Sequence, residues 1–138
     1  MITRARFFWG VVSLLFTLKL SGCGGSDPYE AFLIEVVSVR REFNDILASV
    51  TDKASAEAAK AKITALGERM AEMMERMKKM DVPDQQHATA IQAQYAQRAL
   101  TMQLEGQKHL QRIRQIPEAR DIINDAAKEM ILKANGVR

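Results

Sequence analysis

Apolar residues recur every three or four positions along the chain, which is the spacing of one face of an α-helix. The first such stretch follows Asp27-Pro28. Its recurring residues are Phe32, Val36, Val39, Phe43, Ile46 and Val50. An aspartate caps a helix N-terminus and proline suits the first helical position, so we predict a first helix from Pro28.

Two further stretches repeat this period, from about Lys53 to Met80 and from Asp84 to about Gln115, each preceded or opened by a possible capping aspartate. The second apolar seam consists of Ala59, Ile63, Leu66, Met70, Met73, Met77 and Met80. The third consists of Ala88, Ile91, Tyr95, Ala99, Met102, Gly106, His109, Ile113 and Ile116. Gly67 inside the second stretch costs up to about 1 kcal/mol relative to alanine, which indicates close helix packing or simple tolerance.

A corner is predicted at Ile116-Pro117, because the residue before a proline disfavours the α conformation. A kink in one long helix is the alternative. The final helix is the shortest and ends at Asn135-Gly136, a typical C-terminal cap. No stretch alternates at period two. The sequence therefore predicts an all-α fold, an antiparallel four-helix bundle with a short last helix, or as a fallback a three-helix bundle plus a C-terminal helix.

The N-terminus carries a different pattern. Arg4 and Arg6 precede an apolar run at residues 7–18, and Lys19 closes it. Basic residues followed by an apolar run are the layout of an export signal. Twelve helical residues reach only about 18 Å, well short of a hydrocarbon core of about 30 Å, so a stable membrane-spanning helix is the weaker interpretation.

The residues that follow, Leu20-Ser21-Gly22-Cys23, resemble the lipobox of bacterial lipoproteins. The resemblance implies cleavage between Gly22 and Cys23 and acylation of Cys23. It divides the chain into a signal peptide (1–22), an acylated cysteine with a flexible spacer (23–27) and a helical domain (28–138). Acyl chains would anchor the protein to a membrane of the cell envelope, facing the periplasm or the exported side. An uncleaved anchor and ordinary secretion are the alternatives.

Residues 55–70 (SAEAAKAKITALGERM) also resemble small helical lipoproteins of bacteria, a likeness that implies no activity. The formal charge of +3 comes entirely from Arg4, Arg6 and Lys19 in the leader. Without them, seventeen basic residues face seventeen acidic ones. A neutral domain gives no support for nucleic-acid binding.

A second, smaller apolar stripe lies on the third helix. Leu100 and Leu104 project away from its seam, on a side that is rich in uncharged glutamine. Either the last helix or another molecule is expected to cover them. They are the predicted interaction surface for a protein partner or for self-association.

Metal chemistry has two weak candidates. Met70, Met73 and Met77 could gather Cu(I) through their thioethers, and His109 could bind a metal or haem. Methionine is also a flexible core filler, and a histidine at a helix interface is commonly hydrogen-bonded, so a packing role is the favoured interpretation and no cofactor is expected.

Catalytic motifs are missing from the sequence. It contains no Gly-x-Ser-x-Gly, no phosphate-binding glycine loop, no His-Glu-x-x-His and no Glu-x-x-His. We therefore expect a non-catalytic, lipid-anchored helical module that binds another protein. A copper or haem carrier is the alternative, and a bundle that opens to bind apolar ligands ranks last.

Overall fold

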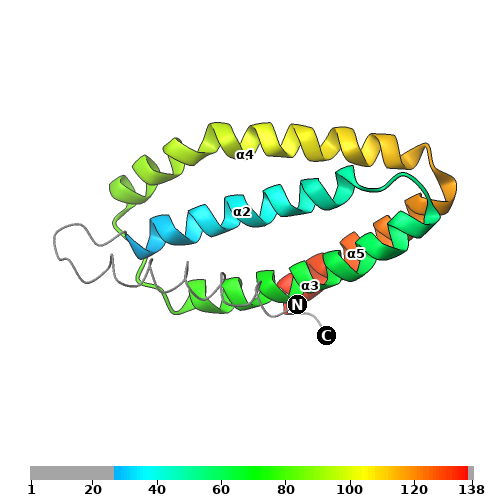
Figure 1. Cartoon of the computed structure of the whole chain (residues 1–138). Helices are drawn as coiled ribbons and strands as arrows, with labels where there is room; N and C mark the ends of the chain where they lie inside the picture. The colour runs from blue at the N-terminus through cyan, green and yellow to red at the C-terminus, as the bar shows by residue number, and fades with distance from the viewer. Residues whose placement is uncertain (1–26, 137–138) are drawn as a thin grey trace, which may run out of the picture.

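The computed structural model describes residues 27–136, which form four α-helices and contain no strand (Figure 1). These are α2 (Pro28–Ala48), α3 (Lys53–Lys78), α4 (Gln85–Arg114) and α5 (Pro117–Ala134). The predicted all-α four-helix bundle with a short last helix is confirmed. The signal peptide, the lipobox and Cys23 lie outside the described residues.

Aspartate side chains begin three of the helices, as the sequence predicts. Asp27 Oδ1 accepts from the Tyr29 amide at 2.8 Å, and Asp84 Oδ1 accepts from the His87 amide at 3.0 Å. At α3, Asp52 accepts from the Ser55 amide at 2.8 Å while Ser55 Oγ accepts from the Asp52 amide at 2.9 Å. This reciprocal arrangement is a capping box. Each cap satisfies amides that have no partner inside their helix.

The fourth helix begins and ends differently. Pro117 occupies its first turn, and no side chain caps it. At the other end Gly136 has a φ of 71°, a left-handed conformation that glycine adopts without steric cost. The Ile116-Pro117 corner is therefore a true break between two helices, and the alternative of one long kinked helix is wrong.

The helices alternate in direction along the chain (Figure 1). The most extensive packing joins α3 to α5 and α2 to α4, while α2–α3 and α4–α5 pack less extensively. Each of the two most extensive pairs consists of helices that run in the same direction. An antiparallel bundle with short connections is expected to pack consecutive helices side by side, and this holds for α2–α3 and α4–α5. This expectation fails for α3 and α4, which have no close backbone contact within the described residues because they lie at diagonal corners.

The best-buried core lies at one end of the bundle. Its largest fully buried side chains are Leu47, Val50, Ile63, Ile113 and Ile123. They come from the end of α2, the loop after it, the first half of α3, the end of α4 and the start of α5, which meet there. The opposite end has only a small cluster of Tyr29, Ala88 and Ile91. The hydrophobic core is therefore unevenly distributed along the bundle.

A long-range contact closes the well-packed end. Arg112 on α4 donates from Nη2 to the Leu47 carbonyl at 2.9 Å and from Nη1 to the Val50 carbonyl. The last carbonyls of a helix have no hydrogen-bond donor within it, so the Arg112 guanidinium supplies donors to carbonyls at the C-terminal end of α2 and just after it.

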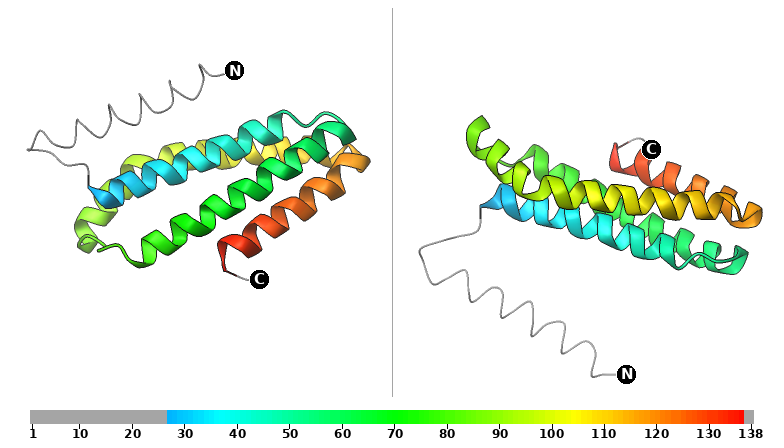
Figure 2. Two further views of the ribbon diagram at one scale, coloured as in Figure 1. Left: turned by 60° about the horizontal axis from the view of Figure 1, so that its bottom comes forward. Right: turned by 90° about the horizontal axis from the view of Figure 1, so that it is seen from above.

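The length of α5 determines which part of the other helices it covers. It has 18 residues, against 26 in α3 and 30 in α4, so it is about 27 Å long beside an α4 of about 45 Å. The two helices α3 and α5 approach closely at Gly67, where an added Cβ would lie 3.0 Å from Met130 Cα. This confirms close packing as the reason for Gly67. With this register, α5 ends level with about residue 71 of α3. Figure 2 shows α3 continuing past the end of α5.

Candidate functional site

The predicted interaction residues are on the outer surface of α4. Leu100 is 50% exposed and Leu104 is 51% exposed. Of the two explanations for this stripe, coverage by the last helix is wrong, because α5 packs mainly on α3 and leaves both leucines open to solvent. The outer leucine pair, Leu100 and Leu104, is therefore an uncovered apolar feature.

The methionine run of α3 packs against the core. Met73 is 3% exposed, and Met70 and Met77 are partly buried against the same cluster. The preferred packing role of these methionines is confirmed. Their use as copper ligands stays a prediction.

The two histidines are on different parts of α4. His109 Nε2 lies 4.0 Å from Glu105 Oε1, one turn away on the same helix, and its role as a haem or metal ligand stays a prediction. His87 Nε2 lies 2.6 Å from Asp27 Oδ2, which joins the starts of α4 and α2. Within residues 27–136, no group of three or more His, Cys, Asp or Glu side chains is placed to hold a metal ion.

A mainly apolar cavity of about 310 Å³ lies between the helices. All four helices contribute to its lining, α5 through Met130 alone. Its other apolar lining residues are Val39, Phe43, Leu66, Met70, Met102 and Leu110. We call it the main cavity because residues of all four helices line it, although surface grooves elsewhere on the molecule have larger volumes.

One buried polar side chain forms part of its lining. Asn44 is 5% exposed and donates from Nδ2 to the Met102 carbonyl at 2.8 Å, and to Glu105 Oε2 at 3.4 Å. Gly106 faces it, and an added Cβ there would lie 2.8 Å from Asn44 Oδ1. The glycine therefore gives Asn44 room to bond to the α4 backbone.

A smaller cavity of about 140 Å³ continues along the α2–α4 interface. Its lining residues are Leu33, Val36, Val37, Arg40, Gln92, Tyr95, Ala96 and Ala99. Arg40 lines both cavities and is the one residue in either lining that is charged at neutral pH. Within residues 27–136, Arg40 has no ion pair. The two cavities together form an apolar groove with a single positive charge.

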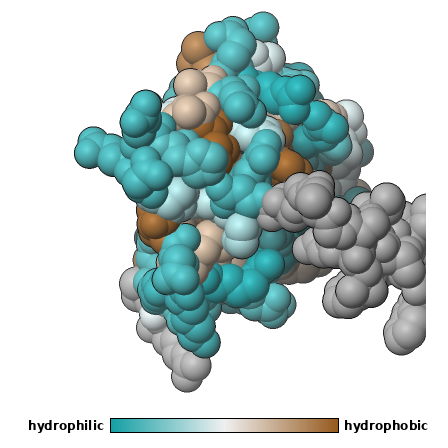
Figure 3. Space-filling model, turned by 90° about the vertical axis from the view of Figure 1, so that its left-hand side faces the viewer, coloured by the Kyte–Doolittle hydropathy of each residue, from teal (hydrophilic) through white to brown (hydrophobic). Residues whose placement is uncertain are grey.

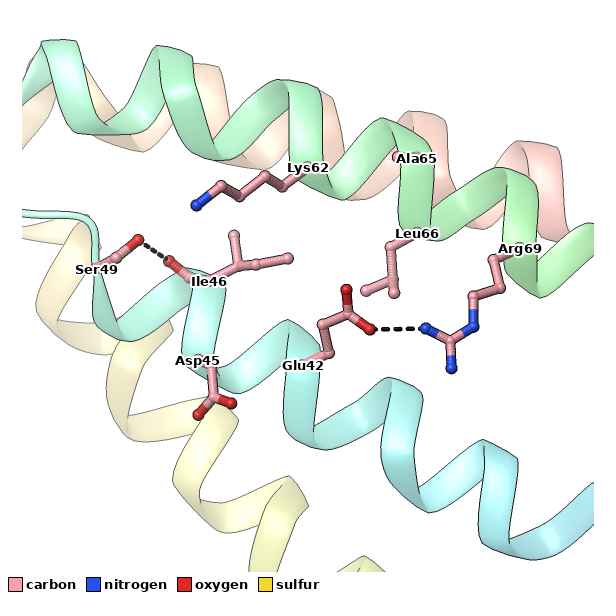
Figure 4. Close-up of a pocket in the computed structure, with 8 residues that line it drawn as sticks. All are labelled: Glu42, Asp45, Ile46, Ser49, Lys62, Ala65, Leu66 and Arg69. Carbon is pink, nitrogen blue, oxygen red and sulfur yellow. Dashed lines mark hydrogen bonds and ion pairs between the residues drawn. The ribbon is translucent and has the colours of Figure 1, made fainter. Parts of the chain in front are cut away.

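A groove of larger volume, about 560 Å³, lies between α2 and α3 and is lined by two acidic and two basic residues (Figure 4). Glu42 and Arg69 pair across it at 2.8 Å, and Lys62 extends from α3 toward α2. Ser49 also lines this groove, and its hydroxyl donates to the Ile46 carbonyl at 2.7 Å at the end of the same helix. The acidic and basic groups are balanced and Glu42 and Arg69 neutralise each other, so we consider the apolar groove the stronger candidate for binding a ligand.

The end of the molecule where α2 and α4 begin has a mostly hydrophilic surface, with small separate hydrophobic areas (Figure 3). Of the exposed large apolar residues, Val82 belongs to the loop near this end. Isolated apolar side chains are common on protein surfaces and do not by themselves indicate binding.

Sequence reasoning identified the outer leucine pair but missed the apolar groove. The residues of the groove follow the same period as the core, so pattern alone assigns them to packing. The signal that could have revealed it is length, since a last helix of 18 residues cannot cover one of 30. None of the helices in residues 27–136 is long and apolar enough to cross a membrane. Comparisons with protein-family models, curated proteins and solved structures gave no match to this chain.

Proposed function

We propose that this protein is a lipoprotein of the bacterial cell envelope, anchored through Cys23, whose helical bundle binds another protein without catalysing a reaction. The observation that carries the binding role is the exposure of the outer leucine pair on the longest helix. Two leucines one turn apart and half exposed form an apolar contact that a partner helix could cover.

The surroundings of the pair support a protein contact. By helical geometry, Ala93, Ala96, Gln97, Gln107 and Gln111 lie on the same side of α4. A surface of small, apolar and amide side chains requires little desolvation of charge on binding, and interface cores are depleted in charged residues. Lys108 and Arg114 are the charged residues toward the edges of this side.

The test is the double variant Leu100→Glu/Leu104→Glu in the full chain, expressed in a bacterial envelope. Association should be lost because two buried carboxylates would face an apolar contact. Affinity capture after membrane solubilisation measures partner recovery, size-exclusion chromatography measures the size of the complex, and circular dichroism measures helicity.

The matched control is Ile34→Glu/Val82→Glu, which charges two apolar side chains of similar or greater exposure on other surfaces. It should retain the complex. Unchanged partners and size in the Leu100/Leu104 variant, with helicity intact, would refute the interaction surface. The anchor is tested separately: Cys23→Ser should release the bundle from membranes or leave an unprocessed precursor.

A further inference from the structure

The apolar groove is located where the fourth helix ends. Ion pairs Glu42–Arg69 and Glu35–Arg76, both at 2.8 Å, show the register of α2 against α3. Residues 35–42 of α2 therefore lie level with residues 69–76 of α3, whereas α5 ends level with about residue 71. The smaller cavity is thus in the part of the bundle that α5 does not reach, and the main cavity is at its boundary.

The shape of the groove is long and narrow. Its lining on α4 extends from Gln92 to Leu110, about 27 Å along the helix axis. The main cavity has the volume of a small-molecule site, about 310 Å³, and the smaller one adds about 140 Å³. An α-helix with its side chains is about 10–12 Å across, so an unbranched chain fits this space better than a peptide helix.

The chemistry of the lining selects one kind of ligand. Valine, leucine, phenylalanine and methionine side chains make up most of the main cavity, and methionine adapts its shape to irregular apolar partners. Arg40 is the sole lining residue with a charge at neutral pH, and it lines both cavities. A guanidinium binds a carboxylate through paired hydrogen bonds, and its long stem can lie along apolar surface.

We propose that the apolar groove binds a long-chain fatty carboxylate, with its carboxylate on Arg40 and its hydrocarbon chain in the main cavity. Neither Leu100 nor Leu104 lines this site, although Ala96 and Gln107 border both surfaces, and the site does not depend on the proposed protein partner. Gln103 lines the main cavity with Arg40 and supplies an amide donor for the carboxylate, whereas the Gln92 amide in the smaller cavity already donates to the Tyr29 hydroxyl.

The probe is a palmitate that carries a photoactivatable diazirine, applied to membranes containing the full chain. After irradiation, mass spectrometry should find adducts on peptides that contain Phe43, Met102 or Met130. Excess palmitate should suppress these adducts, whereas hexadecanol, which has the same chain without the charge, should compete at least about tenfold less well. Equal competition by the two would overturn the assignment of Arg40.

Two substitutions test the site. Arg40→Gln should weaken labelling about tenfold, because it removes the positive charge. Arg41→Gln is the matched control: Arg41 is the next residue on α2 but lines a different surface depression, so labelling should be unchanged. Equal loss in both variants would indicate a general charge effect and refute the site.

A third variant tests the hydrocarbon position independently of charge. Met102→Trp adds bulk inside the main cavity and should abolish labelling while circular dichroism shows unchanged helicity. Labelling that is retained in Met102→Trp would refute binding of the hydrocarbon chain in the groove. Adducts spread over the surface of all four helices would show contact with the bilayer instead, and would also overturn the proposal.

Discussion

Asn44 and Gly106 show how one small residue permits a buried polar contact. The amide of Asn44 bonds to the Met102 carbonyl on the neighbouring helix, and the missing side chain at Gly106 leaves room for its oxygen. A buried amide without a partner is costly, so the pair fixes how α2 lies against α4. Both residues also line the main cavity.

Gly106→Ala should destabilise the protein, although alanine is the better helix former by about 1 kcal/mol. Its Cβ would lie 2.8 Å from Asn44 Oδ1, so Asn44 must move and weaken its hydrogen bond. We expect the free energy of unfolding to fall by about 1 kcal/mol, measured by urea denaturation.

The control is a double-mutant cycle with Asn44→Ala, which removes the oxygen that the new methyl group would meet. In that background Gly106→Ala should become neutral or stabilising. An equal loss in both backgrounds would contradict the steric explanation.

Sequence reasoning succeeded with residues whose partners are close in sequence. Asp27, Asp52 and Asp84 were identified as caps because each bonds to an amide two or three positions on. It missed Asn44 and Arg112, whose partners are 58 or more positions away. Such contacts depend on which helices become neighbours, and helical periodicity does not specify this.

Among the elements, α2 and α4 begin side by side and share a polar contact. Asp27 caps α2 and also contacts His87 in the first turn of α4. The hydrogen bond with His87 first, and then that from the Tyr29 amide, hold the pKa of Asp27 below its ordinary value. A lowered carboxyl pKa means that ionised Asp27 stabilises the folded state.

This stabilisation is present above about pH 4, the unfolded pKa of an aspartate, and is lost as pH falls through the lower folded pKa. Asp27→Asn keeps a good capping residue but removes the charge. The difference in thermal midpoint between the wild type and Asp27→Asn should therefore shrink as pH falls from about 5 to 2.5, as measured by circular dichroism.

His87→Gln separates the two causes of this effect. It removes the imidazole and leaves the cap, so its pH dependence should lie between those of the wild type and Asp27→Asn. Parallel curves for all three proteins would show that this contact does not link folding to protonation.

For the whole molecule, the period of apolar residues predicted the fold class, but not the groove. The position of the groove depends on the register of α5 against α3, which the close approach of Gly67 to Met130 sets. A sequence pattern shows that both residues face a neighbour, but not that they face each other. The short last helix was predicted, whereas the space that it leaves open required the structure.

The uneven core predicts an uneven distribution of stability. The side chains of Leu47, Ile63 and Ile123 at one end of the bundle are fully buried. At the other end, residues 72–78 of α3 extend past the end of α5. Segments with few buried contacts open at lower free energy. Hydrogen exchange should therefore be slower for amides of residues 59–66 than for residues 72–78.

Two matched substitutions test whether that difference reflects the core. Ile123→Ala, in the main core, should lower the free energy of unfolding by about 3 kcal/mol and speed exchange throughout the bundle. Ile91→Ala removes the same atoms from the small cluster at the other end, where it should speed exchange mainly near the starts of α2 and α4. Equal and global effects of the two variants would mean that the bundle unfolds as one cooperative unit, because local opening at the weaker end would then confer no separate exchange pathway.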